Sequence, residues 1–453
     1  MSKANSFRVG KVSGYLRGRV WYLCYFENGK RRRPRAGAER DAARQLAAQV
    51  NSQLETGAPS AMSFEPIGVP ALRDRWLEHH EQVRRSSVQS IARYRTATDH
   101  LLRYLAEHPV RHAGQFTAAQ AAAFVGHLRS LRVSPNGHAN TPKRPLLDKG
   151  VRYVLECCRA LFNHAAKRRH LPPYADNPFA AIEIDRIPVE TARPIELLTT
   201  EQERRLLSTC DDWQFPVFLT LLLTGLRPGE LCHLLLPDDL DLDAGVVRVR
   251  NKPRLGWQVK TRNQRDVPLV PALVDVLRVH LAGRTCGPVF RRRTWADDRL
   301  GLDMSSAAAL ERELTRRFTE WEATRDSSHR GARARLAGRL WCDIGAVDEN
   351  RVRVEFIRAA RAAGLVGQTA PKVFRHQFAT VLQEGRVDPL VRNLLMGHAA
   401  AGARAPGHGL GMTAVYTHTR PETVREQLLA ALADRPALAV ARDWFVRHNR
   451  PDV

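Results

Sequence analysis

The stretch that decides the fold lies in the C-terminal half, where residues 372–380 read KVFRHQFAT and residues 394–398 read LLMGH. The first stretch leads into a helix, and the second ends a short apolar helix at a glycine, a frequent helix stop. Arg375 therefore stands near the start of one helix, and His398 follows the end of the next. The two residues are 23 positions apart (398 minus 375).

A second stretch lies upstream, where residues 224–231 read TGLRPGEL. An apolar helix over residues 217–223 ends at a glycine turn, and a new helix begins with Pro228, a position that suits proline. Arg227 therefore lies at a helix junction, close to free backbone N–H groups that can meet a phosphate. Glu230, three residues later, can hold its guanidinium.

Two more stretches complete the pattern. Residues 413–418 read TAVYTH, and a hairpin reads QVKT at 258–261 and RDVPL at 265–269. In chain order the stretches resemble five boxes of the tyrosine recombinase family, also called phage-integrase-like recombinases. These are an arginine box, a lysine hairpin, an H-x-x-R-H box, a Leu-Gly-His box and a Thr-x-x-Tyr-x-His box. One box alone is common by chance, whereas five in order across residues 199–435 are a specific signal.

The resemblance implies a reaction and a set of catalytic residues. Tyr416 attacks a DNA phosphate, forms a 3′-phosphotyrosyl link and releases a 5′-hydroxyl. Arg227 and Arg375 hold the non-bridging oxygens, since bidentate guanidinium contacts suit a phosphate and its more highly charged transition state. Lys260 protonates the leaving 5′ oxygen, and His398 hydrogen-bonds the phosphate. The bond energy stays in the phosphotyrosine, so no ATP, metal or other cofactor is expected.

Two features depart from the family pattern. Lys372 stands where the family more often has a histidine, near the general acid–base position, and it is a further candidate catalytic residue. The gap from His398 to Tyr416 is longer than the family pattern predicts. The extra residues, 399–411, are rich in Gly and Ala and contain a rival histidine, His408. We prefer His398, because its spacing from the preceding arginine and its apolar approach both match.

The rest of the chain predicts a mainly α-helical protein with small β elements. Segments 56–70 and 187–194 have the loose composition of linkers. The expected parts are a small β-sheet-plus-helix module (1–60), a helical domain (71–185), a mixed, mostly α catalytic domain (195–435) with an insertion at about 291–350, and a C-terminal tail (436–453). By resemblance to the family, the first part is an arm-site DNA-binding domain and the second a core-binding DNA domain.

Local patterns refine two of these parts. In residues 1–60 the aromatic and β-branched runs predict a three-stranded sheet packed on one helix, with Asn28-Gly29 as a hairpin turn. Its third strand is very basic and carries the expected DNA contacts of this module, Lys30, Arg31, Arg32, Arg33 and Arg35. In the catalytic domain, Val246–Val249 is expected to pair with a strand that runs from Trp257–Lys260 to Val267-Pro268.

Composition limits the partners and the compartment. The 453 residues include 71 Lys and Arg against 47 Asp and Glu, a net charge of +24. Such an excess fits a phosphate-rich polymer as partner, although a soluble protein from an arginine-rich proteome would share it. The family resemblance implies that this polymer is double-stranded DNA. Seven cysteines without a C-x-x-C pair argue against a zinc site and a disulfide framework, and favour the cytoplasm. The most apolar run, 215–223, is too short to cross a bilayer, so no membrane is expected.

The sequence leaves other functions open. The family resemblance implies a homo-tetramer on two DNA sites and a role in a phage or mobile element. Type IB topoisomerases use the same Arg, Lys and Tyr chemistry, so an enzyme that only nicks and closes DNA is the nearest alternative. The chain could also be a decayed integrase that binds DNA without cutting it, although the intact boxes argue against this.

Overall fold

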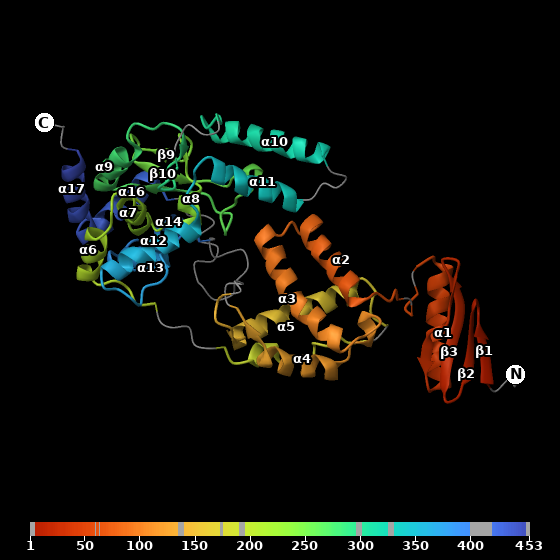
Figure 1. Cartoon of the computed structure of the whole chain (residues 1–453). Helices are drawn as coiled ribbons and strands as arrows, with labels where there is room; N and C mark the ends of the chain where they lie inside the picture. The colour runs from red at the N-terminus through yellow and green to blue at the C-terminus, as the bar shows by residue number, and fades with distance from the viewer. Residues whose placement is uncertain are drawn as a thin grey trace. The chain divides into compact units, whose positions relative to one another are not determined.

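The computed structural model describes residues 5–58, 60–62, 64–134, 140–172, 175–189, 195–295, 301–324, 330–398 and 419–449. They form two compact units, Met1–Ala192 and Arg193–Val453. Helices dominate both units and the sheets are small, which confirms the expected fold class (Figure 1).

The first unit begins with a five-stranded antiparallel sheet backed by helix α1 (Arg40–Glu55). Its strands are β1 (Ser6–Val9), β2 (Val12–Arg17), β3 (Val20–Glu27), β4 (Lys30–Arg32) and β5 (Arg35–Gly37). The expectation of three strands was therefore wrong. The chain adds β1 by a tight turn before β2, and the basic third strand is split. Proline cannot donate to a strand ladder, so the segment breaks at Pro34, and β4 and β5 pair separately with β3.

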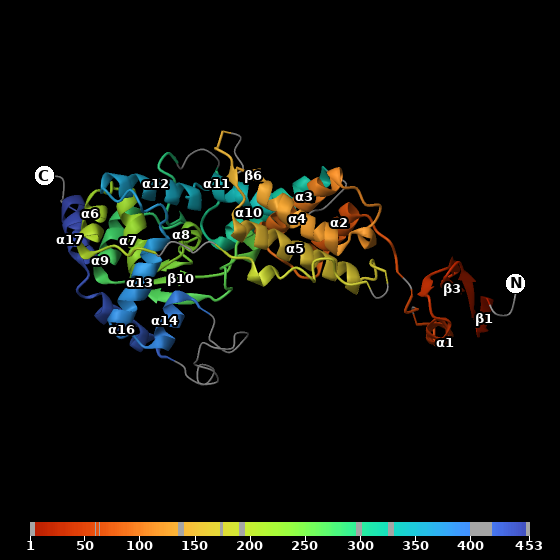
Figure 2. The same ribbon diagram turned by 90° about the horizontal axis from the view of Figure 1, so that it is seen from below.

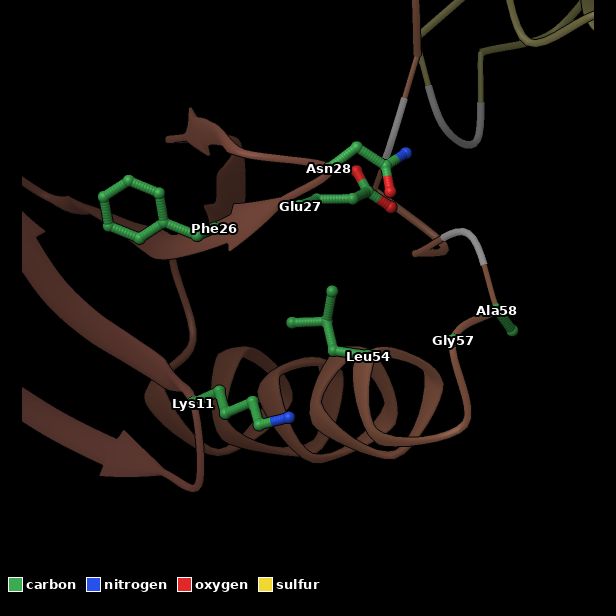
Figure 3. A pocket seen from close by; sticks show the side chains of 7 residues that line it. All are labelled: Lys11, Phe26, Glu27, Asn28, Leu54, Gly57 and Ala58. Carbon is green, nitrogen blue, oxygen red and sulfur yellow. The ribbon is translucent and has the colours of Figure 1, made fainter.

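The end of this module is closed by a buried carboxylate. Glu27 is 5% exposed, accepts a hydrogen bond of 2.6 Å from the backbone N–H of Ser60, and lies 3.7 Å from Arg32. It borders a hollow of about 200 Å³ between the end of β3 and α1, with Lys11 and Leu54 across from it (Figure 3). The segment after α1 is thus hydrogen-bonded to β3 through Ser60 and Glu27. Met62, two residues later, packs in the core of the module.

In the described remainder of the first unit the structure has four α-helices, as the sequence predicted, and a two-residue strand pair, β6 (Arg132–Val133) with β7 (Arg144–Pro145). The helices are α2 (Val69–Gln82), α3 (Val88–Glu107), α4 (Ala118–Ser130) and α5 (Asp148–Lys167). Side-chain caps start two of them: Ser87 accepts from the N–H of Ser90, and Thr117 forms a capping box with Gln120. The apolar face of α5, from Val151 to Ala165, lies at the centre of their shared core.

The second unit is built around α7 (Gln214–Thr224), a helix whose residues are all buried. An apolar helix of this kind must be covered on every side. It contacts α6 (Thr200–Ser208), α9 (Pro271–Leu281), α12 (Glu349–Ala362) and α13 (Lys372–Glu384). Figure 2 shows these helices gathered around it, with α14 (Pro389–Met396) and α16 (Pro421–Leu432) beside α13.

A three-stranded antiparallel sheet lies against these helices, in the order β11 (Arg265–Pro268), β10 (Val246–Val249), β9 (Leu240–Asp241). Two further strands of two residues each, β8 (Leu235–Leu236) and β12 (Gly287–Pro288), pair with each other in a separate antiparallel sheet. The second expected strand was wrong in its first half, because β11 begins only at Arg265. Residues 253–255 form a 3-10 turn, and Arg262 has a positive φ of 59°, so the chain cannot stay extended through Trp257–Lys260.

The segment expected as an insertion contains two long helices, α10 (Ala307–Ala323) and α11 (Arg330–Asp343), which lie side by side (Figures 1 and 2). They enclose a small apolar core of their own that includes Leu310, Leu314, Leu340 and Trp341. This core also contains Leu255 from the loop between β10 and β11.

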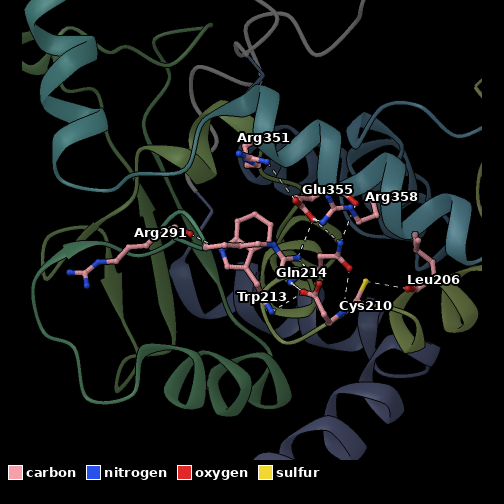
Figure 4. A network of polar contacts seen from close by, with 10 residues as sticks. Leu206, Cys210, Trp213, Gln214, Arg291, Arg351, Glu355 and Arg358 are labelled. Carbon is pink, nitrogen blue, oxygen red and sulfur yellow. Dashed lines mark hydrogen bonds and ion pairs between the residues drawn. The ribbon is translucent and has the colours of Figure 1, made fainter. Parts of the chain in front are cut away.

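A buried carboxylate anchors the chain that enters this segment (Figure 4). Glu355 on α12 is 1% exposed and accepts hydrogen bonds from Gln214 at 2.9 Å and from Arg293 at 3.1 Å. Trp213 donates its indole N–H to the carbonyl of Arg291 at 2.7 Å. The start of α7, α12 and residues 291–293 are therefore held together by one polar network.

Residues 436–448, which the sequence set apart as a tail, form helix α17 (Pro436–His448). Trp444 is 4% exposed and stacks on Phe215 with ring centroids 5.2 Å apart. Helical spacing brings Ala437, Val440 and Ala441 to the same buried face. This segment therefore belongs to the core of the second unit.

In the part of the chain that the structure describes, no helix is both long and apolar enough to cross a membrane.

Candidate active site

Arg227 lies at the junction between α7 and the short helix α8 (Pro228–Cys232). α7 ends at Gly225 with φ of 62°, where a Cβ atom would come within 2.2 Å of the Phe378 ring, so the turn requires glycine. Arg227 is the N-cap of α8, and its backbone N–H and its guanidinium donate to Glu230 at 2.9 and 2.7 Å. The carboxylate thus fixes both the turn and the direction of the arginine.

Glu230 also binds a second arginine, Arg265 on β11. The two Arg265 guanidinium nitrogens lie 2.6 and 3.3 Å from the carboxylate, and its Nε donates to the Leu395 carbonyl at 2.8 Å. Burial opposes ionisation of Glu230, but the hydrogen bonds and charges of Arg265 and Arg227 outweigh it and hold its pKa below the ordinary value. Glu230 is therefore a buried carboxylate shared by two guanidinium groups.

Arg375, in the first turns of α13, joins the same cluster. It is 8% exposed, donates at 2.5 Å to the carbonyl of Gly225, and donates to the carbonyl of Met396. Burial and the neighbouring charge of Arg227 lower its pKa to about 10, against the opposing effect of Glu230. It is still positively charged at neutral pH, and it connects the end of α7 to the end of α14.

His398 follows α14 directly. Gly397 ends the helix with φ of 60°, and the N–H of His398 donates to the Asn393 carbonyl at 3.0 Å. Burial, then the charges of Arg375, Arg227 and Arg265, lower the pKa of the imidazole. The imidazole is only partly covered and still reaches solvent. In its neutral form at physiological pH it can donate one hydrogen bond to a phosphate.

Lys260 lies in a turn that is tied to the same place. The hydroxyl of Thr261 donates to the Gly397 carbonyl at 2.9 Å, next to His398. On the other side, the N–H of Val259 donates to the side chain of Asn251 at 2.9 Å. The backbone around Lys260 is held at both ends, while the lysine side chain itself is exposed.

Lys372 is the first residue of α13 and is exposed. The pKa of His376, one turn further on, is lowered by burial and then by the charges of Lys372 and Arg375. Lys372 precedes Arg375 by three residues on α13, so helical spacing places its positive charge about one turn from the arginine.

The structure brings together Arg227, Arg375, His398 and the turn of Lys260, with Lys372 beside them. Tyr416 and the rival His408 lie outside the described residues, so their positions stay predictions. Of the five basic residues expected to bind DNA in the first unit, four are exposed and Arg32 is half-buried: Lys30, Arg31, Arg32, Arg33 and Arg35.

Arg265 is the residue of this cluster that sequence reasoning missed, because it was considered only as part of a box. A signal was present. Arg265 and Val267 are two residues apart on β11 and so share one face of the strand, and Val267 is fully buried. A charged residue on the buried face of a strand indicates an internal ion pair.

The model of the phage integrase family matches residues 196–422. The chain belongs to this family. The match spans Arg227, Lys260, Arg375, His398 and Tyr416. The sequence-based expectation of a tyrosine recombinase is thereby confirmed.

Individual proteins are similar to this phage integrase family member over most of its length. Tyrosine recombinase XerA of Thermococcus kodakarensis is 25% identical over 316 residues, which are 69% of this chain and 81% of the relative. A lambda integrase dimer bound to a COC′ core site is 17% identical, with a TM-score of 0.48, and the match covers 86% of this chain and 92% of that one. The Tn1549 transposon integrase in complex with a circular intermediate DNA is 16% identical, with a TM-score of 0.42 and coverage of 80% and 99%.

Proposed function

We propose that this chain is a site-specific recombinase that cleaves and rejoins DNA strands through a 3′-phosphotyrosyl link to Tyr416, in the service of a phage or mobile element. The observation that carries the proposal is the cluster of Arg227, Arg265 and Arg375 around the buried carboxylate of Glu230. Three guanidinium charges against one carboxylate leave an excess of positive charge, which suits a phosphodiester and still more its transition state.

The chemistry follows from this arrangement. The phenol oxygen of Tyr416 forms a bond to phosphorus, the bond from phosphorus to the 5′ oxygen breaks, and the proton of the Lys260 ammonium goes to that oxygen. The phenol proton goes to a base, since an ordinary tyrosine ionises only near pH 10. Arg227 and Arg375 stabilise the phosphate charge. In rejoining, the 5′-hydroxyl of another strand attacks the phosphotyrosyl phosphorus and releases Tyr416. The energy of the phosphodiester bond is therefore conserved.

The partner that we propose is double-stranded DNA, in keeping with the net charge of +24. Exchange between two duplexes breaks four strands, and each chain has one Tyr416, so four copies on two sites are required. In this assembly residues 1–60 bind a flanking arm site and residues 71–185 bind the core site. We also propose a cytoplasmic location, because all seven cysteines are free and thiols stay reduced there.

Covalent capture tests this function without a known target. The protein is mixed with nicked duplexes that have a randomised central region, and DNA that stays attached in detergent is sequenced. Two duplexes with the selected site are then combined. Recombinant products are expected. Relaxation of supercoils without any exchange would favour the topoisomerase-like alternative, and no adduct at all would indicate a DNA-binding relative without catalysis.

Removing the first module separates the two proposed DNA-binding parts. Met62 packs in the core of that module, so the deletion is best made over residues 1–62. We expect the shortened protein to keep its footprint on the core site and to lose binding at a flanking site. A full-length variant with Arg31, Arg33 and Arg35 changed to Ala should behave in the same way. An unchanged footprint in both would contradict the arm-site assignment.

Lys372 is proposed to serve as an acid–base group near the phosphate. Lys372→Ala should slow single-turnover cleavage about 100-fold or more, because proton transfer by a positioned side chain contributes this much. Lys372→His should retain substantial cleavage, since an imidazole can also exchange a proton there. The rates are measured on a nicked substrate at saturating enzyme and several pH values. An unchanged rate for Lys372→Ala at saturation would leave it as a DNA-backbone contact only.

A further inference from the structure

The α10–α11 segment packs directly on the loop that precedes Lys260. Trp341 on α11 donates its indole N–H to the carbonyl of Leu255 at 3.0 Å, and Leu255 is 1% exposed within the core of this segment. Gly256 has φ of 73°, and a Cβ atom on it would lie 2.7 Å from the Cβ of Ala337. Loop and helix are therefore in contact without room for another side chain.

A cluster of aromatic rings extends this contact to α8. His233, at the end of α8, stacks on Trp257 with centroids 4.7 Å apart and an interplanar angle of 15°, and it meets Trp341 edge-on at 4.7 Å. Its Nδ1 lies 2.6 Å from the Gly229 carbonyl, and burial lowers its pKa to about 4. A neutral His233 is thus fixed between the loop and the short helix whose N-cap is Arg227.

The loop is also closed on itself. Lys252 and Trp257 exchange two backbone hydrogen bonds of 3.0 and 3.1 Å, and the Lys252 ammonium lies 5.6 Å from the Trp257 ring centre. The same ammonium forms a buried ion pair of 2.7 Å with Asp239, which is 1% exposed. An ion pair this well buried holds the loop in one position, since breaking it would leave an uncompensated charge.

We propose that Trp341 is a positioning residue for Lys260. By fixing Leu255 and Trp257 against α8, it sets the distance between the lysine turn and Arg227, so that the ammonium can protonate the leaving 5′ oxygen. This inference rests on the proposed role of Lys260 as the acid. The Lys260 side chain is exposed, so its reach to the leaving oxygen depends on where the turn is held, and a displacement of about 1 Å can reduce a rate about 100-fold.

A pair of DNA substrates distinguishes this role from general support of the fold. One has the normal 5′ oxygen at the scissile phosphate, and the other has sulfur in that bridging position. A thiolate leaves without protonation, so the sulfur substrate does not need the acid. On the oxygen substrate Trp341→Ala should cleave about 100-fold more slowly than the unmodified protein. On the sulfur substrate its rate should be close to that of the unmodified protein. Lys260→Ala should show the same pattern.

Two further variants make the result specific. Trp341→Phe keeps an aromatic ring, though a smaller one, and removes the N–H to Leu255, and it should show a smaller loss on the oxygen substrate with the same rescue by sulfur. It carries the test if Trp341→Ala does not fold. Phe318→Ala is the matched control, because Phe318 stacks on Trp321 and lies under Arg333 within the same segment. It should cleave both substrates at the original rate.

The outcomes separate the inference from the function on which it rests. Rescue of Lys260→Ala by sulfur, without rescue of either Trp341 variant, would overturn the positioning role alone. Full activity of both Trp341 variants on the oxygen substrate would do the same. Failure of sulfur to rescue Lys260→Ala would overturn the acid assignment and the positioning role with it.

Discussion

Tyr416→Phe is expected to bind DNA as the original protein does and to form no covalent complex. Phenylalanine keeps the aromatic ring and removes only the oxygen that attacks phosphorus. The expected loss is complete, because no other group in the proposed reaction can form the phosphotyrosyl bond. Binding is measured by gel shift on the captured site, and adducts are measured in detergent on a nicked substrate.

Tyr153→Phe is the matched control for this variant. Burial is the main cause that raises the pKa of Tyr153 to about 12, and the Arg93 guanidinium lies 4.8 Å from its ring centre. A phenol that stays protonated in a helical core makes a poor nucleophile at neutral pH. Tyr153→Phe should therefore retain full cleavage, and residual adduct formation by Tyr416→Phe would contradict the assignment.

Arg227→Ala should reduce the rate of single-turnover cleavage about 100- to 1000-fold while weakening DNA binding only modestly. A contact that strengthens in the transition state acts mainly on rate, whereas one lost phosphate contact among many has a small effect on affinity. The fold should survive, because Arg265 still pairs with Glu230 after the change. Thermal unfolding checks this point.

Arg375→Ala tests the second guanidinium but also removes two hydrogen bonds, to the carbonyls of Gly225 and Met396. We expect a similar loss of rate together with a lower melting temperature, since unpaired buried carbonyls cost about 1–3 kcal/mol each. Arg278→Ala is the control for loss of a positive charge, because Arg278 forms only an exposed ion pair with Asp243.

For Arg227→Ala, equal losses of cleavage rate and DNA affinity would contradict the prediction. Arg227 would then be an ordinary DNA-binding residue.

The boxes and the fold class could be predicted because they depend on local pattern. Gly225 and Gly397 each end a helix with a positive φ, and sequence alone indicates such stops. Arg227 and Arg375 were identified from the family boxes, and for Arg227 the helix junction supplied a second argument. The family match over residues 196–422 confirms the family, and the roles of the individual residues stay predictions.

The rest depends on contacts between residues that are distant in the chain. The pairing of Arg265 with Glu230, 35 positions away, decides the charge of the site, and only the folded structure brings these residues together. The same holds for Trp341 and Leu255, 86 positions apart, which gives the α10–α11 segment a role that its composition did not suggest. Pattern also failed where a turn replaced a strand, as at Arg262.

The identity of the attacking residue is the central claim, and one measurement tests it most directly. The original protein is trapped on a nicked duplex, digested with protease and nuclease, and the peptide that retains the nucleotide is sequenced by mass spectrometry. We predict a phosphotyrosyl bond at Tyr416. A nucleotide attached to any other residue, or the absence of a covalent adduct at a site that is demonstrably cut, would contradict the account.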